Sequence, residues 1–143
     1  MPLLRAEIRL DRPFGNGMMP RLMALMTKGF VNARELNRHF SEHGPDFGVS
    51  NATDYEHQAD AFLGGQHSSG VQECARRKGD IIRYDPQTEA YGVVDKDGVI
   101  RTFFKPVPCS KVPASVRAAV KLSGRCHGHQ NNLVYFQAEC RKW

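Results

Sequence analysis

The chain lacks any apolar run approaching the ~20 residues that a membrane-spanning helix needs. Residues 1–15 scatter arginine and glutamate among the apolar side chains, so they hold no uninterrupted apolar segment of the signal-peptide kind. Internal repeats, low-complexity tracts, a glycine-rich phosphate loop and the GxSxG motif of serine hydrolases are also missing. We therefore expect neither a membrane span nor a Sec signal, and the commonest nucleotide-binding and hydrolase motifs are excluded.

Cysteine is scarce, and none of the four residues forms a CxxC pair: Cys74, Cys109, Cys126 and Cys140. Without a secretion signal, reduced thiols are the default expectation. If the thiols are oxidised, three pairings remain open. The stretch CHGH at 126–129 also offers sulfur and imidazole ligands for zinc, but its spacing matches no zinc-finger pattern. A polar loop that caps the following helix is the simpler interpretation.

The chain has 143 residues, a length that fits one domain. Positive charge is unevenly distributed along it. The net charge of +5 divides into +4 for residues 1–40, −6 for residues 41–100 and +7 for residues 101–143. A basic C-terminal third joined to an acidic middle is typical of proteins that bind nucleic acid. A merely solvated basic face accounts for the same charges, so charge alone leaves both interpretations open.

Hydrophobic periodicity changes from helical to alternating near residue 70. It predicts helices over 21–29, 32–44 and 51–65, strands over 71–77, 80–85, 89–95 and 99–105, and helices over 113–124 and 131–143. Short connections between the strands predict an antiparallel meander. We expect an α+β fold, with N-terminal helices packed on a four-stranded sheet and a C-terminal helix. The single domain, 1–143, divides into an extension (1–30), a core (31–106) and a helical tail (107–143).

Two histidines, His39 and His43, stand four residues apart on the helix predicted for 32–44. Leu36 and Phe40 should face the core of the protein, which leaves the histidines on an adjacent stripe near the end of the helix. Such a pair can bind a metal, transfer protons or lie on the surface. No cluster of aspartates predicts a Mg²⁺ site, so we expect neither a metal nor a cofactor.

A ribonuclease that works without metal needs groups for proton transfer and cations for the phosphate. Histidine suits the first task, and arginine or lysine suits the second. The last predicted strand supplies Arg101, Thr102 and Lys105, and simple alternation places Arg101 and Lys105 on one face. We therefore predict a catalytic set on the helix and the last strand, with RNA contacts from the neighbouring strand and the basic turn RRKGD. The set is His39, His43, Arg101, Thr102 and Lys105, with Arg83, Tyr84, Arg77 and Lys78 as contacts.

Three linked segments carry a family resemblance: RHFSEHGPDFG, TDYEHQADAFLGG and GDIIRYDPQTEAYGVVDKDGVIRTFFKP. Together they resemble the barnase–EndoU–colicin–RelE-like (BECR) nuclease domains at the C-termini of bacterial polymorphic and contact-dependent toxins. The resemblance covers residues 36–106, and GHQNNLVYFQAEC is similar to the closing helix of the same domains. Residues 1–30, the stretch 107–130 and the four cysteines have no counterpart in it.

The resemblance implies helices packed on a four-stranded antiparallel sheet and a metal-independent RNase, often aimed at tRNA, that leaves a 2′,3′-cyclic phosphate. It places His43 at the helix histidine, Thr102 at the strand threonine, and Arg101 and Lys105 at the basic strand positions. It also implies a cognate immunity protein and action in the cytoplasm of a target bacterium, after delivery by a secretion system. A non-catalytic nucleic-acid- or protein-binding module, with or without zinc, is the first alternative, and an ADP-ribosyltransferase-type effector is the second.

Overall fold

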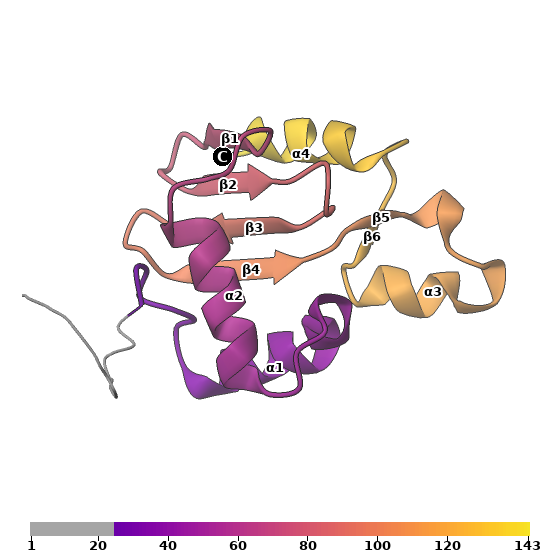
Figure 1. Ribbon diagram of the computed structural model, residues 1–143. Coiled ribbons are helices and arrows are strands. Elements are labelled where there is room, and N and C mark those ends of the chain that lie inside the picture. The colour runs from indigo at the N-terminus through magenta and orange to yellow at the C-terminus, as the bar shows by residue number, and fades with distance from the viewer. Residues whose placement is uncertain (1–24) are drawn as a thin grey trace, which may run out of the picture.

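Two capped helices open the part of the chain that the computed structural model describes, residues 25–143 (Figure 1). Helix α1 (Ala33–His43) and helix α2 (Ala52–Gly64) are joined by the 3₁₀ turn η1 (Gly44–Phe47). The side chains of Asn32 and Asn51 accept hydrogen bonds from backbone N–H groups of the first turn, each 2.9 Å long. These N-caps satisfy donors that a helix end leaves unpaired, so both helices begin within a residue of the predicted position.

The sheet is the antiparallel meander that the alternating pattern predicts. Its strands run in the order β1 (Gln72–Ala75), β2 (Ile81–Tyr84), β3 (Tyr91–Val94) and β4 (Ile100–Phe104). The C-terminal helix α4 (Asn132–Cys140) completes the predicted α+β fold. No helix of the described residues has the length and apolar character that crossing a bilayer requires.

Between β4 and α4 the chain makes an excursion past the end of the sheet, visible to the right of β4 in Figure 1. It contains β5 (Val107–Pro108), η2 (Cys109–Lys111), α3 (Ala114–Leu122) and β6 (Cys126–His127). The two short strands pair in parallel. Helix α3 was predicted from the sequence. The strands β5 and β6 were not predicted, because two residues are too few to show periodicity.

Both faces of the sheet are covered. Helix α2 packs on one face, where Tyr55, Ala59, Leu63 and Phe103 belong to one buried cluster. Helix α4 packs on the other face, where Phe136 joins Ile82, Tyr91 and Phe104. This arrangement explains why Phe103 and Phe104, adjacent in sequence, are both buried. In α4, Phe136 is buried, whereas Leu133 is 41% exposed.

All four cysteines form disulfides, so the expectation of reduced thiols is wrong for this structure. Cys74 of β1 joins Cys140 at the end of α4, and Cys109 joins Cys126 across the excursion. The first bond holds α4 on the sheet and the second closes the loop around α3. Spacing did not separate the three pairings, because each bond joins residues that only the tertiary fold brings together.

The segment before α1 is docked on the domain rather than helical. Residues 25–29 lack helical structure, so the prediction for 21–29 is wrong over that part, and the rest lies outside the described residues. The backbone N–H groups of Met26 and Thr27 donate to the buried carboxylate of Asp60 at 2.9 and 2.7 Å. Phe30, 6% exposed, lies in the α2-side core.

A bulge in β4 changes which residues share a face. Val94 pairs with Ile100 and Val93 pairs with Thr102, so Arg101 is an extra residue without a partner on β3. As a result Arg101 lines the same pocket as Thr102, on the α4 side, whereas Lys105 lines a pocket with Phe103 on the α2 side. The prediction that Arg101 and Lys105 share a face is therefore wrong, because strict alternation ignores the inserted residue.

Candidate active site

The two histidines of α1 are buried against the edge of the sheet. His39 is 7% exposed and His43 is 4% exposed, less than Leu36 and Phe40 on the neighbouring stripe. The His39 ring lies 5.0 Å from the Phe30 ring, and the His43 ring lies 5.2 Å from the Phe104 ring, measured between centroids. Helix α1 thus places its histidines, rather than its surface charges, beside β4.

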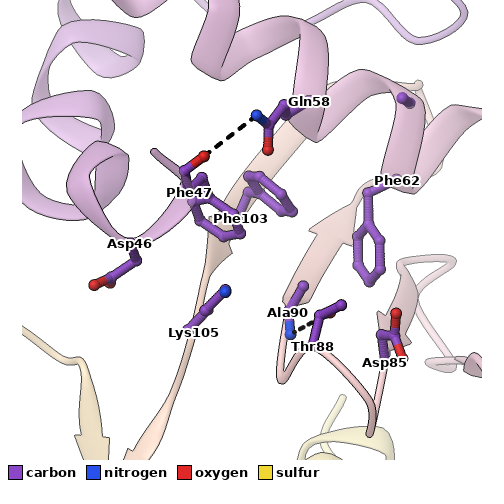
Figure 2. Close-up of a pocket in the computed structure, with 10 residues that line it drawn as sticks. Asp46, Phe47, Gln58, Phe62, Asp85, Thr88, Ala90, Phe103 and Lys105 are labelled. Carbon is purple, nitrogen blue, oxygen red and sulfur yellow. Dashed lines mark hydrogen bonds between the residues drawn. The ribbon is translucent and has the colours of Figure 1, made fainter. Parts of the chain in front are cut away.

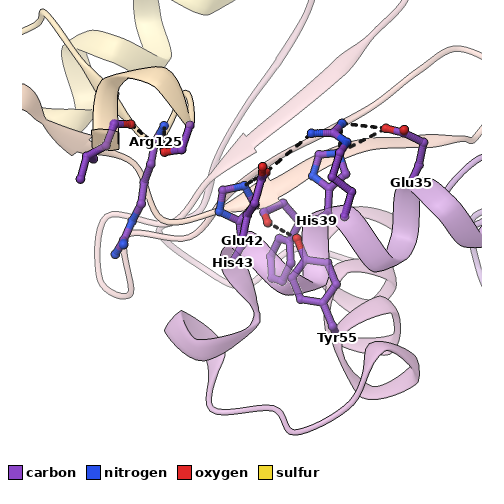
Figure 3. Close-up of polar contacts among 10 residues, drawn as sticks. Glu35, His39, Glu42, His43, Tyr55 and Arg125 are labelled. Carbon is purple, nitrogen blue, oxygen red and sulfur yellow. Dashed lines mark hydrogen bonds and ion pairs between the residues drawn. The ribbon is translucent and has the colours of Figure 1, made fainter. Parts of the chain in front are cut away.

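Burial keeps both imidazoles neutral at pH 7. Loss of solvation lowers the pKa of His39 to about 4, and the nearby Arg38 guanidinium acts in the same direction. The pKa of His43 is also lowered to about 4, first by burial and then by His39. Figure 3 shows the two rings on one side of α1, with Glu35 and Glu42 beside them.

One nitrogen of each ring is left without a partner. The Nδ1 atoms of His39 and His43 are buried, and neither has a hydrogen-bond partner among the described residues. Unpaired buried polar atoms are rare in proteins, and each calls for a functional or hydration explanation. Arg38 can only donate to His39 Nε2, at 3.2 Å, so the free Nδ1 of neutral His39 carries the ring proton. His43, whose ring makes no hydrogen bond within the described residues, keeps a nitrogen that can accept a proton.

On the α4 side of the sheet, β4 borders a pocket of about 270 Å³, which we call the α4-side pocket. Thr102 and Phe104 line it from β4, Tyr91 from β3 and Tyr135 from α4. The His43 ring packs on Phe104, one of these lining residues, although His43 does not itself line the pocket. Its cationic lining residues are Arg76, Lys78 and Arg101.

Only two of those cations are available to a ligand. The Arg76 guanidinium donates to the Glu139 carboxylate at 2.8 Å and to Asp80 at 3.2 Å, and its side chain is 11% exposed. Arg101 is 62% exposed and Lys78 is 57% exposed, and their nearest carboxylates lie 3.9 and 3.5 Å away. Arg101 and Lys78 can therefore turn to an anionic ligand without breaking a buried ion pair.

Arg101 also connects the α4-side pocket to His39. A second hollow, of about 230 Å³, is lined by His39, Glu35, Arg38 and Arg101. One exposed guanidinium thus borders both the hollow that contains His39 and the pocket that contains Thr102. Of the predicted catalytic residues, the fold brings His39, His43, Arg101 and Thr102 together around β4.

A second histidine pair lies where β6 leads into α4. The Nε2–H of His127 donates to Asn132 Oδ1 at 2.7 Å, and its Nδ1 accepts from the His129 backbone N–H at 3.2 Å. Its ring stacks on Tyr135 at 4.4 Å. Burial lowers the pKa of His127, although its bond to Asn132 opposes the shift. Both of its ring nitrogens are thus occupied.

His129 differs from His127 in having free ring nitrogens. Within residues 25–143 neither ring nitrogen has a hydrogen-bond partner, and the ring lies 6.1 Å from that of Tyr135, a lining residue of the α4-side pocket. Sequence reasoning considered this stretch only as a zinc candidate or a capping loop. The bond between Cys109 and Cys126 takes away the thiolate that a zinc site there would need.

The predicted RNA contacts fall at separate places. Arg83 is 12% exposed and donates to Glu73 at 2.7 Å and to the Phe62 carbonyl at 3.0 Å, so it holds the end of α2 on the sheet. The buried Tyr84 donates to Glu89. Arg77 stacks on Trp143 at 4.9 Å. Of the four predicted contacts, only Lys78 lines the α4-side pocket.

No family model matches the chain, and neither does any curated protein. Among solved structures, the chain is similar to a ribonuclease from Escherichia coli in complex with its inhibitor protein. The two chains are 19% identical with a TM-score of 0.40, over 63% of this chain and 98% of that chain.

Proposed function

We propose that this chain is a metal-independent endoribonuclease of the bacterial toxin type, which cleaves RNA, tRNA first among the candidates, by attack of a ribose 2′-OH on the adjacent phosphate. The proposal is supported above all by the pocket beside β4, where Arg101 and Thr102 line the walls and His43 packs on Phe104. Cations, a hydroxyl group and an imidazole are the groups that this reaction needs.

His43 is the proposed base. It is neutral at pH 7, so its imidazole can take the 2′-OH proton without first losing one. Its low pKa makes it a weak base in the free protein. A bound phosphate would bring negative charge to the pocket and raise the pKa of His43, because a nearby anion favours the protonated ring. His39, one turn earlier on α1, is proposed to orient His43.

Arg101 and Lys78 are proposed to hold the phosphate, with Thr102 as a hydrogen-bond donor. Arginine suits this role because its planar fork donates two parallel hydrogen bonds to phosphate oxygens. Groups that already line the pocket then stabilise the negative charge that develops on the phosphorane. His129 is proposed to give a proton to the departing 5′-oxygen, and the products are a 2′,3′-cyclic phosphate and a free 5′-hydroxyl.

The direct test is incubation of the folded protein with total tRNA in EDTA. We expect cleavage with 2′,3′-cyclic phosphate ends. Arg101→Ala should lower kcat/KM at least tenfold, whereas Lys121→Ala, which removes an exposed cation from α3, should not. No cleavage of any RNA by folded protein contradicts the proposal. Salt-dependent RNA binding without turnover would instead support the non-catalytic binding module.

A toxin of this kind is proposed to act in the cytoplasm of a target bacterium and to be neutralised by a cognate immunity protein. The net charge of +7 on residues 101–143 favours an acidic inhibitor that competes with RNA. Expression in a bacterial host tests this point. Growth should stop with wild-type protein and continue with Arg101→Ala, and co-expression of the acidic product of a neighbouring gene should restore growth.

A further inference from the structure

A larger pocket lies on the opposite face of the sheet, and none of the roles above uses it. It has a volume of about 450 Å³ and is formed by η1, α2, the β2–β3 turn and the end of β4 (Figure 2). We call it the α2-side pocket. The residues that line it include Asp46, Phe47, Phe62, Asp85, Phe103 and Lys105.

Aromatic rings form one wall of this pocket. The Phe47 ring stacks on the Phe103 ring with centroids 4.1 Å apart and planes 15° apart, and Phe62 lies 5.6 Å from Phe103. Phe103 is buried, but Phe47 and Phe62 are only half-buried, so part of each of their rings borders the pocket. Exposed aromatic faces are the usual platform for a stacked nucleobase.

The polar groups of the pocket are mostly acceptors. Gln58 uses its amide N–H₂ on the Phe47 carbonyl at 3.4 Å, which leaves its side-chain oxygen for a ligand. Asp85 Oδ1 accepts from the Gln87 N–H at 2.9 Å, and its other oxygen has no partner among the described residues. The Asp46 carboxylate is not open to a ligand, because its Oδ1 accepts from Arg125 at 2.9 Å and its Oδ2 has almost no exposed surface. The free oxygens of Gln58 and Asp85 select a ligand that carries amino donors.

A single lysine adds a place for an anion. Among the described residues, Lys105 is the one cation that lines the pocket, and its Nζ lies 5.4 Å from the centroid of the Phe47 ring. A planar ring with an amino group, joined to a phosphate, matches the aromatic wall, the acceptors and this ammonium together. That combination is a nucleotide of cytosine, adenine or guanine, whose exocyclic amino groups donate to carboxylates and amide oxygens.

The pocket lies close to the proposed cleavage site along the chain and in space. Phe47 follows His43 by one turn of η1, and Lys105 directly follows Phe104, on which His43 packs. Asp46 also bridges to Arg125 at 2.9 Å, and the Arg125 charge acts on His43. An RNA chain that passes His43 can therefore reach the α2-side pocket around the end of β4.

We propose that the α2-side pocket binds one amino-bearing base of the RNA, cytosine, adenine or guanine, with Lys105 on the phosphate of that nucleotide. The identification of the ligand as part of an RNA rests on the proposed function. The pocket thereby selects the sequence that is cleaved, while Arg101 and Thr102 on the other face act at the reacting phosphate. Uracil is disfavoured, because it presents a carbonyl oxygen where cytosine presents its amino group.

Binding of single nucleotides tests the pocket separately from cleavage. The folded, ¹⁵N-labelled protein is titrated with CMP, AMP, GMP and UMP. We expect amide shifts at Phe47, Phe62 and Lys105, and a Kd at least tenfold lower for one of the three amino-bearing nucleotides than for UMP. Equal affinity for all four, or shifts confined to the Arg101 and Thr102 side, would overturn the proposal.

Two variants sharpen the test. Asp85→Asn keeps an oxygen for the Gln87 N–H but replaces an acceptor by an amide donor, so the preference should move toward UMP. Lys105→Ala should weaken binding of nucleotides but not of the corresponding nucleosides, and Lys121→Ala on α3 is the matched control. An unchanged base preference in Asp85→Asn, with the spectrum of a folded protein, counts against the pocket.

Cleavage assays then separate the two proposals. If the protein cuts RNA without preference for the base and binds no monophosphate, the pocket assignment fails and the ribonuclease stands. If the protein binds CMP, AMP or GMP through Phe47 and Lys105 but cuts no RNA, the nucleotide pocket stands and the catalytic proposal fails.

Discussion

The imidazole ring of His43 lies on the ring of Phe104, with centroids 5.2 Å apart, and this contact joins α1 to the strand that carries Arg101 and Thr102. It places a histidine against a lining residue of the α4-side pocket, with the histidine itself 4% exposed. A proton-transfer group with so little freedom is held in one orientation, which favours catalysis when the bound substrate is aligned with the ring.

Replacing His43 tests this arrangement directly. His43→Gln keeps a polar side chain of similar reach but removes the ring nitrogen that takes the proton. We expect RNA cleavage to fall at least 100-fold, as general-base contributions of this size are common. The control is His67→Gln, because His67 is exposed and lies on the loop after α2. Circular dichroism should show both variants folded, and full activity in His43→Gln would remove His43 from the mechanism.

Substitutions in the second pair, His127 and His129, should separate a structural role from a catalytic one. His129→Gln removes a ring whose nitrogens have no partner in the described part of the chain, so activity should fall at least tenfold with little change in melting temperature. His127→Gln breaks the bond to Asn132 and the stack on Tyr135, so stability should fall by about 1–2 kcal/mol. Thermal melts and initial rates of both variants distinguish these outcomes, and the reverse pattern would exchange the assigned roles.

Stability should decrease on mild acidification because of the α1 histidines. Their pKa values in the folded protein are about 4, below the 6.5 of an unfolded histidine. Between these values the unfolded chain binds protons that the folded chain does not, so the free energy of unfolding falls as pH falls. Urea melts at pH 7.5, 6 and 5 should show this loss. It should be smaller in a His39→Gln, His43→Gln double variant, and an equal loss in that variant would locate the effect elsewhere.

Reduction of the disulfides should destabilise the domain unequally. The bond between Cys74 and Cys140 spans 66 residues, and the bond between Cys109 and Cys126 spans 17. Loop-closure entropy predicts losses of about 4 and about 3 kcal/mol for their removal. Denaturant melts of Cys74→Ala, Cys140→Ala and of Cys109→Ala, Cys126→Ala measure each loss. The first pair should also speed amide exchange in α4, since it is the pair that fixes this helix to β1.

Helical periodicity and alternation predicted the fold because they act locally. Asn32 and Asn51 fix where α1 and α2 begin, and the strands follow the alternating pattern between short turns. The site was less predictable. Arg101 and Lys105 were expected on one face, and only the pairing with β3 reveals the bulge that separates them. The burial of His39 and His43 depends on how α1 lies along β4, and Arg83 is occupied by groups distant in sequence. Such tertiary contacts leave no periodic signal.

The two disulfides are nested, with the smaller loop enclosed by the larger one. A protease that cuts the exposed surface of α3, or any bond between Cys74 and Cys140, therefore yields fragments that remain covalently joined. A nicked molecule would run as a single species on a non-reducing gel and would come apart only after a thiol is added. After such cleavage the fragments would stay joined in an oxidising environment and would separate in a reducing one.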